Sequence, residues 1–331
     1  NNGVHPHFHE QGAPKTGSIE NGDFDTFEDF FQAYLAQQQF LVDNAVALNN
    51  MLAEAHECMR PTPFLSSLMQ GCIEKGADVT AGGAAWNTSG TANIGLADVT
   101  DSLMAIKTLV FDTKTVSFDR MKRALQTSFS ADPELHAMIR SRVPRFGSGS
   151  DEAVAMANQV TSALHKMYAR KKNHRGGVYT TGFWSMSQHV AYGNLSGALP
   201  SGRPAGKAFT PGLTPDPQAS VNFLDNIRDV ARLDPENMDN NIAFNIKLNP
   251  AAADSRQKTV DTMHAYIRTY FDLGGMQMQF NVVNADMLKD AMANPEHYRN
   301  LLVRISGYNA YFVTLNRDMQ VELIERAEFG M

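Results

Sequence analysis

Cysteine is scarce in this chain: Cys58 and Cys72 are the only two among 331 residues. They form neither a disulfide framework nor a C-x-x-C metal or redox motif. Long apolar runs are missing as well, since nothing approaches the roughly 20 residues that a transmembrane helix requires. These absences favour a protein of a reducing compartment, and we expect a cytoplasmic location without a membrane partner.

An excess of positive charge is also lacking. The chain carries 29 Lys and Arg against 35 Asp and Glu, which gives a formal net charge of −6. Nucleic-acid-binding proteins usually present a basic patch to the phosphate backbone, so we expect no nucleic-acid partner. In contrast, hydrophobic residues make up 43% of the chain, which is ample for a buried core.

Helical periodicity is abundant. A helix is predicted to begin at Asp25, with Glu28 completing a capping box, and to end near Pro61. Apolar residues at helical spacing predict further helices over residues 64–75, 98–110, 118–128, 132–141, 151–171, 222–232, 256–272 and 319–326.

Strand patterns are fewer. Alternating apolar residues predict strands over residues 178–184, 241–248, 277–283 and 303–311. Strands separated by long helices indicate an α/β fold. Residues 193–220 contain five prolines and are predicted to be irregular.

A glycine near the C-terminus is the most informative residue. Residues 304–312 read Arg-Ile-Ser-Gly-Tyr-Asn-Ala-Tyr-Phe, which places Gly307 in a run too apolar for an ordinary surface turn. Just upstream, residues 274–283 read Gly-Gly-Met-Gln-Met-Gln-Phe-Asn-Val-Val. An isolated Ser-Gly-Tyr would be a plain turn. The two runs together resemble the C-terminal signature of glycyl radical enzymes, in which one backbone glycine stores an unpaired electron.

Glycine suits that role for physical reasons. The amide nitrogen and the carbonyl beside a Cα radical stabilise it when the Cα is planar, and a Cβ would crowd that planarity. Glycine also adopts backbone conformations closed to other residues. The resemblance implies that Gly307 carries the radical, which is the one cofactor expected, and that this chain holds no metal.

The resemblance covers essentially the whole chain. It implies an α/β fold: residues 1–270 would form the C-terminal part of a ten-stranded barrel surrounded by helices, and residues 271–331 a glycine radical domain. Because the first residue is Asn and the resembled enzymes are much longer, we expect a piece of a larger enzyme. Further matching segments are residues 63–76, 82–84, 101–107 and 175–177.

Enzymes of this family pair the glycine with a cysteine, whose thiyl radical takes a hydrogen from the substrate. In the lyases this cysteine lies in a Gly-Cys-x-Glu loop, a pattern that Gly71, Cys72 and Glu74 match. The segment nevertheless resembles a block downstream of the catalytic loop, and Cys72 lies too close to Gly307 in the sequence. We therefore expect Cys72 to be a buried thiol and the thiyl cysteine to belong to the remainder of the barrel. Glu74 is either a catalytic acid or base or a solvated glutamate.

By the same resemblance, residues 178–184 line the substrate cavity, with Thr181 and Phe183 as candidate substrate-binding residues. This segment offers aromatic and hydroxyl groups but no cation that would grip a sulfonate. The runs 182–187 and 209–215 look most like those of arylacetate decarboxylases, which act on compounds such as 4-hydroxyphenylacetate. We therefore expect a carboxy-lyase. The alternatives are a dehydratase or a C–N or C–S lyase acting on a small alcohol, and a stand-alone radical-bearing subunit without its own catalysis.

The resemblance also implies partners. A radical S-adenosylmethionine activating enzyme would remove the hydrogen of Gly307, and the remainder of the barrel would supply the thiol. The substrate would be a small molecule. Homodimers are common in the family, and arylacetate decarboxylases can carry an additional small iron–sulfur subunit.

Histidines provide the last candidates. His5, His7 and His9 alternate as in a zinc-binding strand, but the surrounding Gly, Pro and Asn favour a loop. His189 is expected to be a hydrogen-bonded barrel residue rather than an acid or base.

Overall fold

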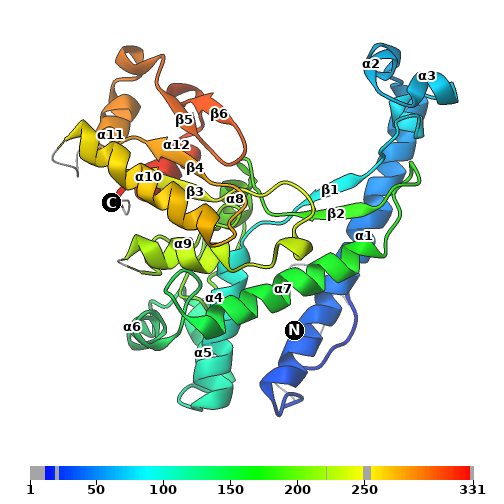
Figure 1. The fold of residues 1–331 in the computed structure, drawn as a ribbon. Helices are drawn as coiled ribbons and strands as arrows, with labels where there is room; N and C mark the ends of the chain where they lie inside the picture. The colour runs from blue at the N-terminus through cyan, green and yellow to red at the C-terminus, as the bar shows by residue number, and fades with distance from the viewer. Residues whose placement is uncertain (1–11, 19–21, 221, 249–254, 329–331) are drawn as a thin grey trace. The chain divides into compact units, whose positions relative to one another are not determined.

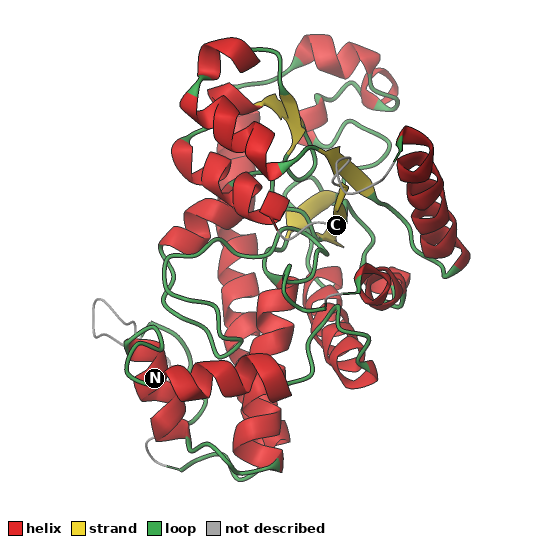
Figure 2. Cartoon of the chain, turned by 90° about the vertical axis from the view of Figure 1, so that its left-hand side faces the viewer, coloured by secondary structure: helices red, strands yellow, loops and turns green. Residues whose placement is uncertain are grey.

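The computed structural model describes residues 12–18, 22–220, 222–248 and 255–328. Helices dominate these ranges, and the strands form three two-stranded pairs (Figure 2). None of the helices in the described ranges is long and apolar enough to cross a membrane. The chain divides into two compact units, each discontinuous in sequence. Unit 1 combines residues 1–91, 161–181 and 237–240, and unit 2 combines residues 92–160, 182–236 and 241–331.

The N-terminal part of the chain begins with one long helix, α1 (Phe27–Met59), drawn in blue in Figure 1. Its predicted start at Asp25 is wrong by one residue. Thr26 is the N-cap, because its side chain accepts a hydrogen bond from Asp29 N while the Asp29 carboxylate accepts one from Thr26 N. The capping box therefore has the predicted chemistry with different residues.

The helix predicted over residues 64–75 is divided at Gly71 into α2 (Pro63–Leu68) and α3 (Cys72–Lys75). Gly71 has a φ of +96°, and a Cβ there would lie 2.8 Å from Ala85 N and 2.9 Å from Gly83 O. Only glycine fits this close approach. After α3 the chain forms β1 (Ser89–Ala92), which pairs with β2 (Tyr179–Gly182).

Unit 2 is mostly helical, and most of its helices match the predicted ranges to within two residues. α7 (Asp151–Ala169) begins in this unit and ends in unit 1. Residues 195–220 contain neither helix nor strand, as predicted. The other helices are α4 (Leu96–Ile106), continued by a π-helical segment (Lys107–Asp112), α5 (Phe118–Gln126), α6 (Pro133–Arg142), α8 (Gln188–Asn194), α9 (Phe223–Ala231), α10 (Arg256–Asp272), α11 (Ala285–Ala293) and α12 (Arg317–Glu328).

A parallel strand pair lies in the C-terminal part of unit 2. β3 (Asn245–Leu248) and β4 (Gln279–Val282) pair with Asn245 opposite Gln279, and the side chains of these two residues are hydrogen-bonded. α10 connects the two strands along the chain. Parallel strands need such a crossover, so the predicted alternation of strands and helices is realised here.

The single strand predicted over residues 303–311 is wrong. The chain instead forms an antiparallel hairpin of β5 (Leu302–Arg304) and β6 (Asn309–Tyr311), in which Arg304 lies opposite Asn309. Apolar residues continue through the turn between β5 and β6, so the alternating pattern does not reveal that the chain reverses direction there.

The hairpin packs on apolar residues that come almost entirely from the C-terminal segment of the chain. Ile305 and Phe312, which flank the hairpin turn and β6, are fully buried. Among the described buried residues of this cluster, Val190 of α8 alone lies outside residues 283–327. This C-terminal core comprises Val190, Val283, Leu288, Ala291, Val303, Ile305, Phe312, Met319, Leu323, Ile324 and Ala327.

Replacing Phe312 by alanine tests the importance of this core. Because the ring is fully buried, Phe312→Ala should lower the free energy of unfolding by roughly 3–5 kcal/mol. Tyr311 is 46% exposed, so Tyr311→Ala should lower it by less than about 1 kcal/mol. Urea denaturation followed by circular dichroism measures both. Equal losses for the two variants would contradict the assignment of Phe312 to the core.

Candidate active site at the Gly307 turn

Ser306 and Gly307 form the turn between β5 and β6. Ile305 N donates a hydrogen bond to Tyr308 O across the turn at 2.9 Å. The φ angle is positive at Gly307, at +100°, but not at Ser306, which is the sign pattern of a type II turn and favours glycine at this position. Ser306 is fully buried, whereas Gly307 is exposed in this chain. The turn therefore presents the backbone of Gly307 at the surface of the chain.

A loop over residues 183–187 lies against this turn. Met186 N donates to Ser306 O at 3.0 Å. A Cβ on Gly307 would first meet the indole of Trp184, 3.4 Å from ring atom Cε3. One face of Gly307 thus adjoins an aromatic ring.

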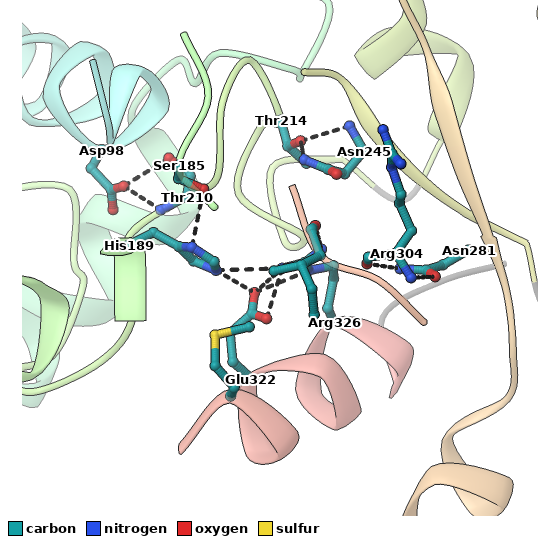
Figure 3. A network of polar contacts seen from close by, with 12 residues as sticks. Asp98, Ser185, His189, Thr210, Thr214, Asn245, Asn281, Arg304, Glu322 and Arg326 are labelled. Carbon is teal, nitrogen blue, oxygen red and sulfur yellow. Dashed lines mark hydrogen bonds and ion pairs between the residues drawn. The ribbon is translucent and has the colours of Figure 1, made fainter. Parts of the chain in front are cut away.

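A buried polar network, the His189 network, lies next to the turn (Figure 3). His189 on α8 contacts Ser185 Oγ through Nδ1 at 3.0 Å and Glu322 Oε1 through Nε2 at 3.4 Å. Glu322 accepts two hydrogen bonds from Arg326 Nη2, at 2.6 and 2.7 Å, one turn further along α12. Arg326 Nη1 donates to Ile305 O at 3.1 Å. The network therefore connects α8 and α12 to the carbonyl that precedes the turn.

The charge state of Glu322 follows from its surroundings. Burial opposes its ionisation, but the charge of Arg326 and the hydrogen bond from His189 outweigh that effect and lower the pKa of Glu322 to about 2. At neutral pH the buried carboxylate is therefore ionised and paired with the guanidinium of Arg326.

Side-chain amides of β4 connect the sheet to the hairpin. Asn281 Oδ1 accepts from Arg304 N at 2.7 Å, and Asn281 Nδ2 donates to Arg304 O at 2.5 Å. Gln279 Oε1 accepts from Arg304 Nε at 2.9 Å. The position of the turn is thus set by polar contacts from β4, from the 183–187 loop and from α12.

The chemistry that this arrangement offers resides in the backbone. Ser185 and His189 are hydrogen-bonded to each other, but they are 2% and 0% exposed, so the serine hydroxyl is not placed to attack a ligand from solvent. Gly307 presents an exposed Cα–H in a fixed turn. Gly307 is therefore the reactive candidate of this site.

The two predicted substrate-binding residues are both buried. Thr181 N donates to Asp239 Oδ1 at 2.6 Å, while Thr181 Oγ1 has no hydrogen-bond partner among the described residues. Phe183 is held through its backbone, by Asn241 O at 2.8 Å and Ala243 N at 3.0 Å. A buried hydroxyl without a partner is unusual, so Thr181 stays a candidate for contact with a ligand. The substrate-binding role of both residues stays a prediction.

Cys72 and Glu74 lie in α3, in unit 1. Cys72 is 3% exposed, as expected for a buried thiol. Glu74 is exposed, and its carboxylate accepts a hydrogen bond from Gly71 N at 3.0 Å. The observed contact of Glu74 is that of a helix cap, and its acid–base role stays a prediction.

The histidine predictions have different outcomes. His189 is confirmed as a hydrogen-bonded residue by its contact with Ser185. His5, His7 and His9 lie outside the described residues. Across the part of the chain that the structure describes, no three His, Cys, Asp or Glu side chains are grouped so that they could hold a metal ion.

Comparison with known proteins identifies the family of this chain. The profile of the pyruvate formate lyase-like family matches residues 1–193, and the glycine radical profile matches residues 209–313, which include the Gly307 turn. The chain belongs to the glycyl radical enzymes of the pyruvate formate lyase-like family. The resemblance seen in the sequence is thereby confirmed.

The alignments with individual relatives cover nearly the whole chain. Trans-4-hydroxy-L-proline dehydratase of Clostridioides difficile is 30% identical over 329 residues, which cover 99% of this chain and 41% of that protein. Indoleacetate decarboxylase of Tractidigestivibacter scatoligenes is 28% identical over 349 residues, covering 97% of this chain and 40% of that protein.

Solved structures of glycyl radical enzymes share the fold and confirm the predicted α/β class. The glycerol-bound form of the B12-independent glycerol dehydratase from Clostridium butyricum has a TM-score of 0.91 at 33% identity, covering 98% of this chain and 41% of that chain. This chain therefore spans about two-fifths of the length of the relatives that it matches.

Sequence reasoning did not identify Trp184, Glu322 and Arg326 as neighbours of the turn. The spacing of Glu322 and Arg326 does signal an ion pair along a helix. Such pairs usually lie at the surface, and nothing in the spacing shows that this pair is buried against Ile305. The contact of Trp184 with Gly307 joins segments that are distant in the sequence, and no local pattern encodes it.

The low pKa of Glu322 predicts an acid-sensitive step in stability. The pKa of Glu322 is about 2 in the folded state, against an ordinary 4.5. Its ionisation therefore contributes fully to the free energy of unfolding above pH 4.5, and this contribution is lost as the pH falls from 4.5 toward 2. The full shift corresponds to on the order of 3 kcal/mol. Urea denaturation at several pH values should show this step in the wild type and not in Glu322→Gln.

The exposed Glu325 lies on the same helix, so Glu325→Gln is the matched control and should keep the step. If Glu322→Gln and Glu325→Gln give the same pH profile, the buried pairing of Glu322 does not stabilise the fold.

Proposed function

We propose that Gly307 stores a glycyl radical and passes it to a cysteine thiol, which begins a lyase reaction. One observation carries this proposal: an exposed turn glycine with a φ of +100° lies within the region that matches the glycine radical profile. The turn requires glycine for its conformation, and a planar radical Cα requires glycine for its electronic stability. Transfer of the thiol hydrogen to the Cα breaks the S–H bond, restores the C–H bond and leaves a thiyl radical.

The thiol is proposed to lie in the remainder of the catalytic barrel. Cys72 is buried in α3, and the relatives are longer than this chain. We assign residues 1–270 to the barrel and residues 271–331 to the radical domain. A radical S-adenosylmethionine activating enzyme is the expected source of the radical. A homodimer and, for a decarboxylase, a small iron–sulfur subunit would complete the assembly.

An arylacetate such as 4-hydroxyphenylacetate is the first proposed substrate. The similarity to indoleacetate decarboxylase over 97% of the chain supports this proposal. The unpartnered hydroxyl of Thr181 and the ring of Phe183 are groups suited to an aromatic substrate. Glu74 is the proposed acid or base for the substrate proton, provided that the assembled enzyme shields its carboxylate from water.

Dehydration of a small hydroxylated substrate is the second proposal. It is favoured by the similarity to the hydroxyproline dehydratase and to the glycerol dehydratase, at 30% and 33% identity. In both proposals Gly307 has the same role, and only the reaction of the substrate radical differs.

Gly307→Ala tests the radical. The activated wild-type enzyme should show a glycyl radical signal by electron paramagnetic resonance, and exposure to air should release a short C-terminal peptide. Gly307→Ala should lose both. A Cβ would lie 3.4 Å from Cε3 of Trp184, an ordinary contact distance, so the variant should fold with a loss of about 1–2 kcal/mol from the positive φ.

Gly274→Ala is the matched control, because Gly274 is exposed, has a φ of +94° and has no atom within 4 Å of an added Cβ. It carries similar backbone strain and should retain both the radical signal and the cleavage. A radical signal of normal intensity in Gly307→Ala would refute the proposed function.

Product analysis distinguishes the two substrate classes. The activated enzyme should release carbon dioxide and a cresol from 4-hydroxyphenylacetate. Turnover of small diols or hydroxyproline, without turnover of arylacetates, would reject the decarboxylase proposal and support the dehydratase proposal.

A further inference from the structure

The charged and polar side chains of the His189 network are largely buried. The side chains of Glu322 and Arg326 are 11% and 10% exposed, and His189 is fully buried. Leu323 and Ala327, which follow them along α12, belong to the C-terminal core. A buried ion pair adds little net stability compared with apolar residues of the same volume, and its clearest use is to specify one arrangement of the chain. The contacts of the network show which arrangement it specifies.

The two carbonyls that precede Gly307 are both hydrogen-bonded. Arg326 Nη1 donates to Ile305 O at 3.1 Å, and Met186 N donates to Ser306 O at 3.0 Å. A peptide unit is planar and contains the Cα atoms on both sides. Fixing the carbonyl of Ser306 therefore fixes the plane that contains the Cα of Gly307, and fixing the carbonyl of Ile305 fixes the plane before it.

The contacts also form a closed ring. From the 183–187 loop, Ser185 Oγ contacts His189, and His189 contacts Glu322. Glu322 holds the guanidinium of Arg326, which leaves Nη1 directed at Ile305 O. The chain then enters the turn, whose Ser306 carbonyl is bound by Met186, beside Ser185. Figure 3 shows the part of this ring that runs from Ser185 through His189 and Glu322 to Arg326.

We propose that Ser185, His189, Glu322 and Arg326 are positioning residues that form a latch for the Gly307 turn. The latch holds the peptide planes before Gly307, so the Cα of Gly307 occupies one position relative to the 183–187 loop. Its relevance to catalysis rests on the proposed radical function, whereas the latch itself is a property of the turn and can be tested without a radical.

Arg326→Met removes the donor to Ile305 O and leaves a shorter, unbranched apolar side chain. Peptides that contain residues 302–311 should exchange their amide hydrogens roughly tenfold faster or more than in the wild type. Peptides of α4 should be unchanged. Hydrogen–deuterium exchange with mass spectrometry on the full chain measures both. Arg317 is exposed at the first turn of the same helix, so Arg317→Met is the matched control and should exchange like the wild type.

A double variant separates the latch from the stability of the fold. Arg326→Met alone leaves Glu322 buried without its partner, which destabilises the segment in general. Glu322→Met with Arg326→Met removes both charges together, so neither is left without its partner, but the carbonyl of Ile305 still has no donor from α12. This variant should unfold like the wild type in urea and still show fast exchange over residues 302–311. Wild-type protection of the hairpin in the double variant would overturn the proposal.

Radical lifetime provides the second measurement. In the activated enzyme, the glycyl signal of Arg326→Met should decay several-fold faster in a fixed low concentration of oxygen than that of Arg317→Met. Equal decay in both variants, together with fast exchange in Arg326→Met, would show that the latch does not protect Gly307 and would overturn its catalytic relevance. Absence of a signal in the wild type would instead refute the proposed radical function, and the exchange result would still decide whether the latch exists.

Discussion

The guanidinium of Arg326 is the group on which the geometry of the C-terminal segment depends. It carries the charge that keeps Glu322 ionised despite its burial, and it donates to Ile305 O. A planar group with several fixed donors can bind a carboxylate and a carbonyl at once, and a lysine ammonium cannot hold both with the same geometry. The turn that presents Gly307 is therefore coupled to α12 by the shape of one side chain as well as by its charge.

Two kinds of contact hold the hairpin, and they act in different places. Apolar contacts join it to α11 and α12, so the C-terminal segment is largely one packed body. Polar contacts join that body to its neighbours, through Asn281 on β4, Met186 in the 183–187 loop and His189 on α8. The hydrophobic effect has no preferred direction, whereas hydrogen bonds are directional. The apolar contacts therefore stabilise the C-terminal segment as one unit, and the polar contacts fix the position of the Gly307 turn.

The sequence was sufficient to predict features that depend on the chemistry of a single residue or on local periodicity. Gly307 could be identified because its neighbours are atypical of a turn, and α10 because its apolar period is regular. The hairpin could not be predicted, because the residues on both sides of Gly307 keep an apolar pattern while the chain reverses. β1 was missed because Ser-Gly-Thr-Ala has few of the β-branched and aromatic residues that mark strands.

The site was less predictable than the fold, since its contacts are tertiary. Glu322 and Arg326 have the spacing of an ordinary surface pair, and only packing shows that they are buried beneath the turn. His189 was correctly expected to be hydrogen-bonded, but its partner on α12 is remote in the sequence. Family resemblance located the glycine and gave no information about the side chains that hold it.

The turn also removes a symmetry from Gly307. Glycine is achiral, and its two α-hydrogens are equivalent in a freely rotating peptide with symmetric surroundings. In this turn the hydrogen that an L side chain would replace points toward the indole of Trp184, with the Cβ position 3.4 Å from the ring. The other hydrogen points away from that ring. The two α-hydrogens of Gly307 are therefore sterically distinct. A reagent that approaches from the side opposite Trp184 meets only one of them.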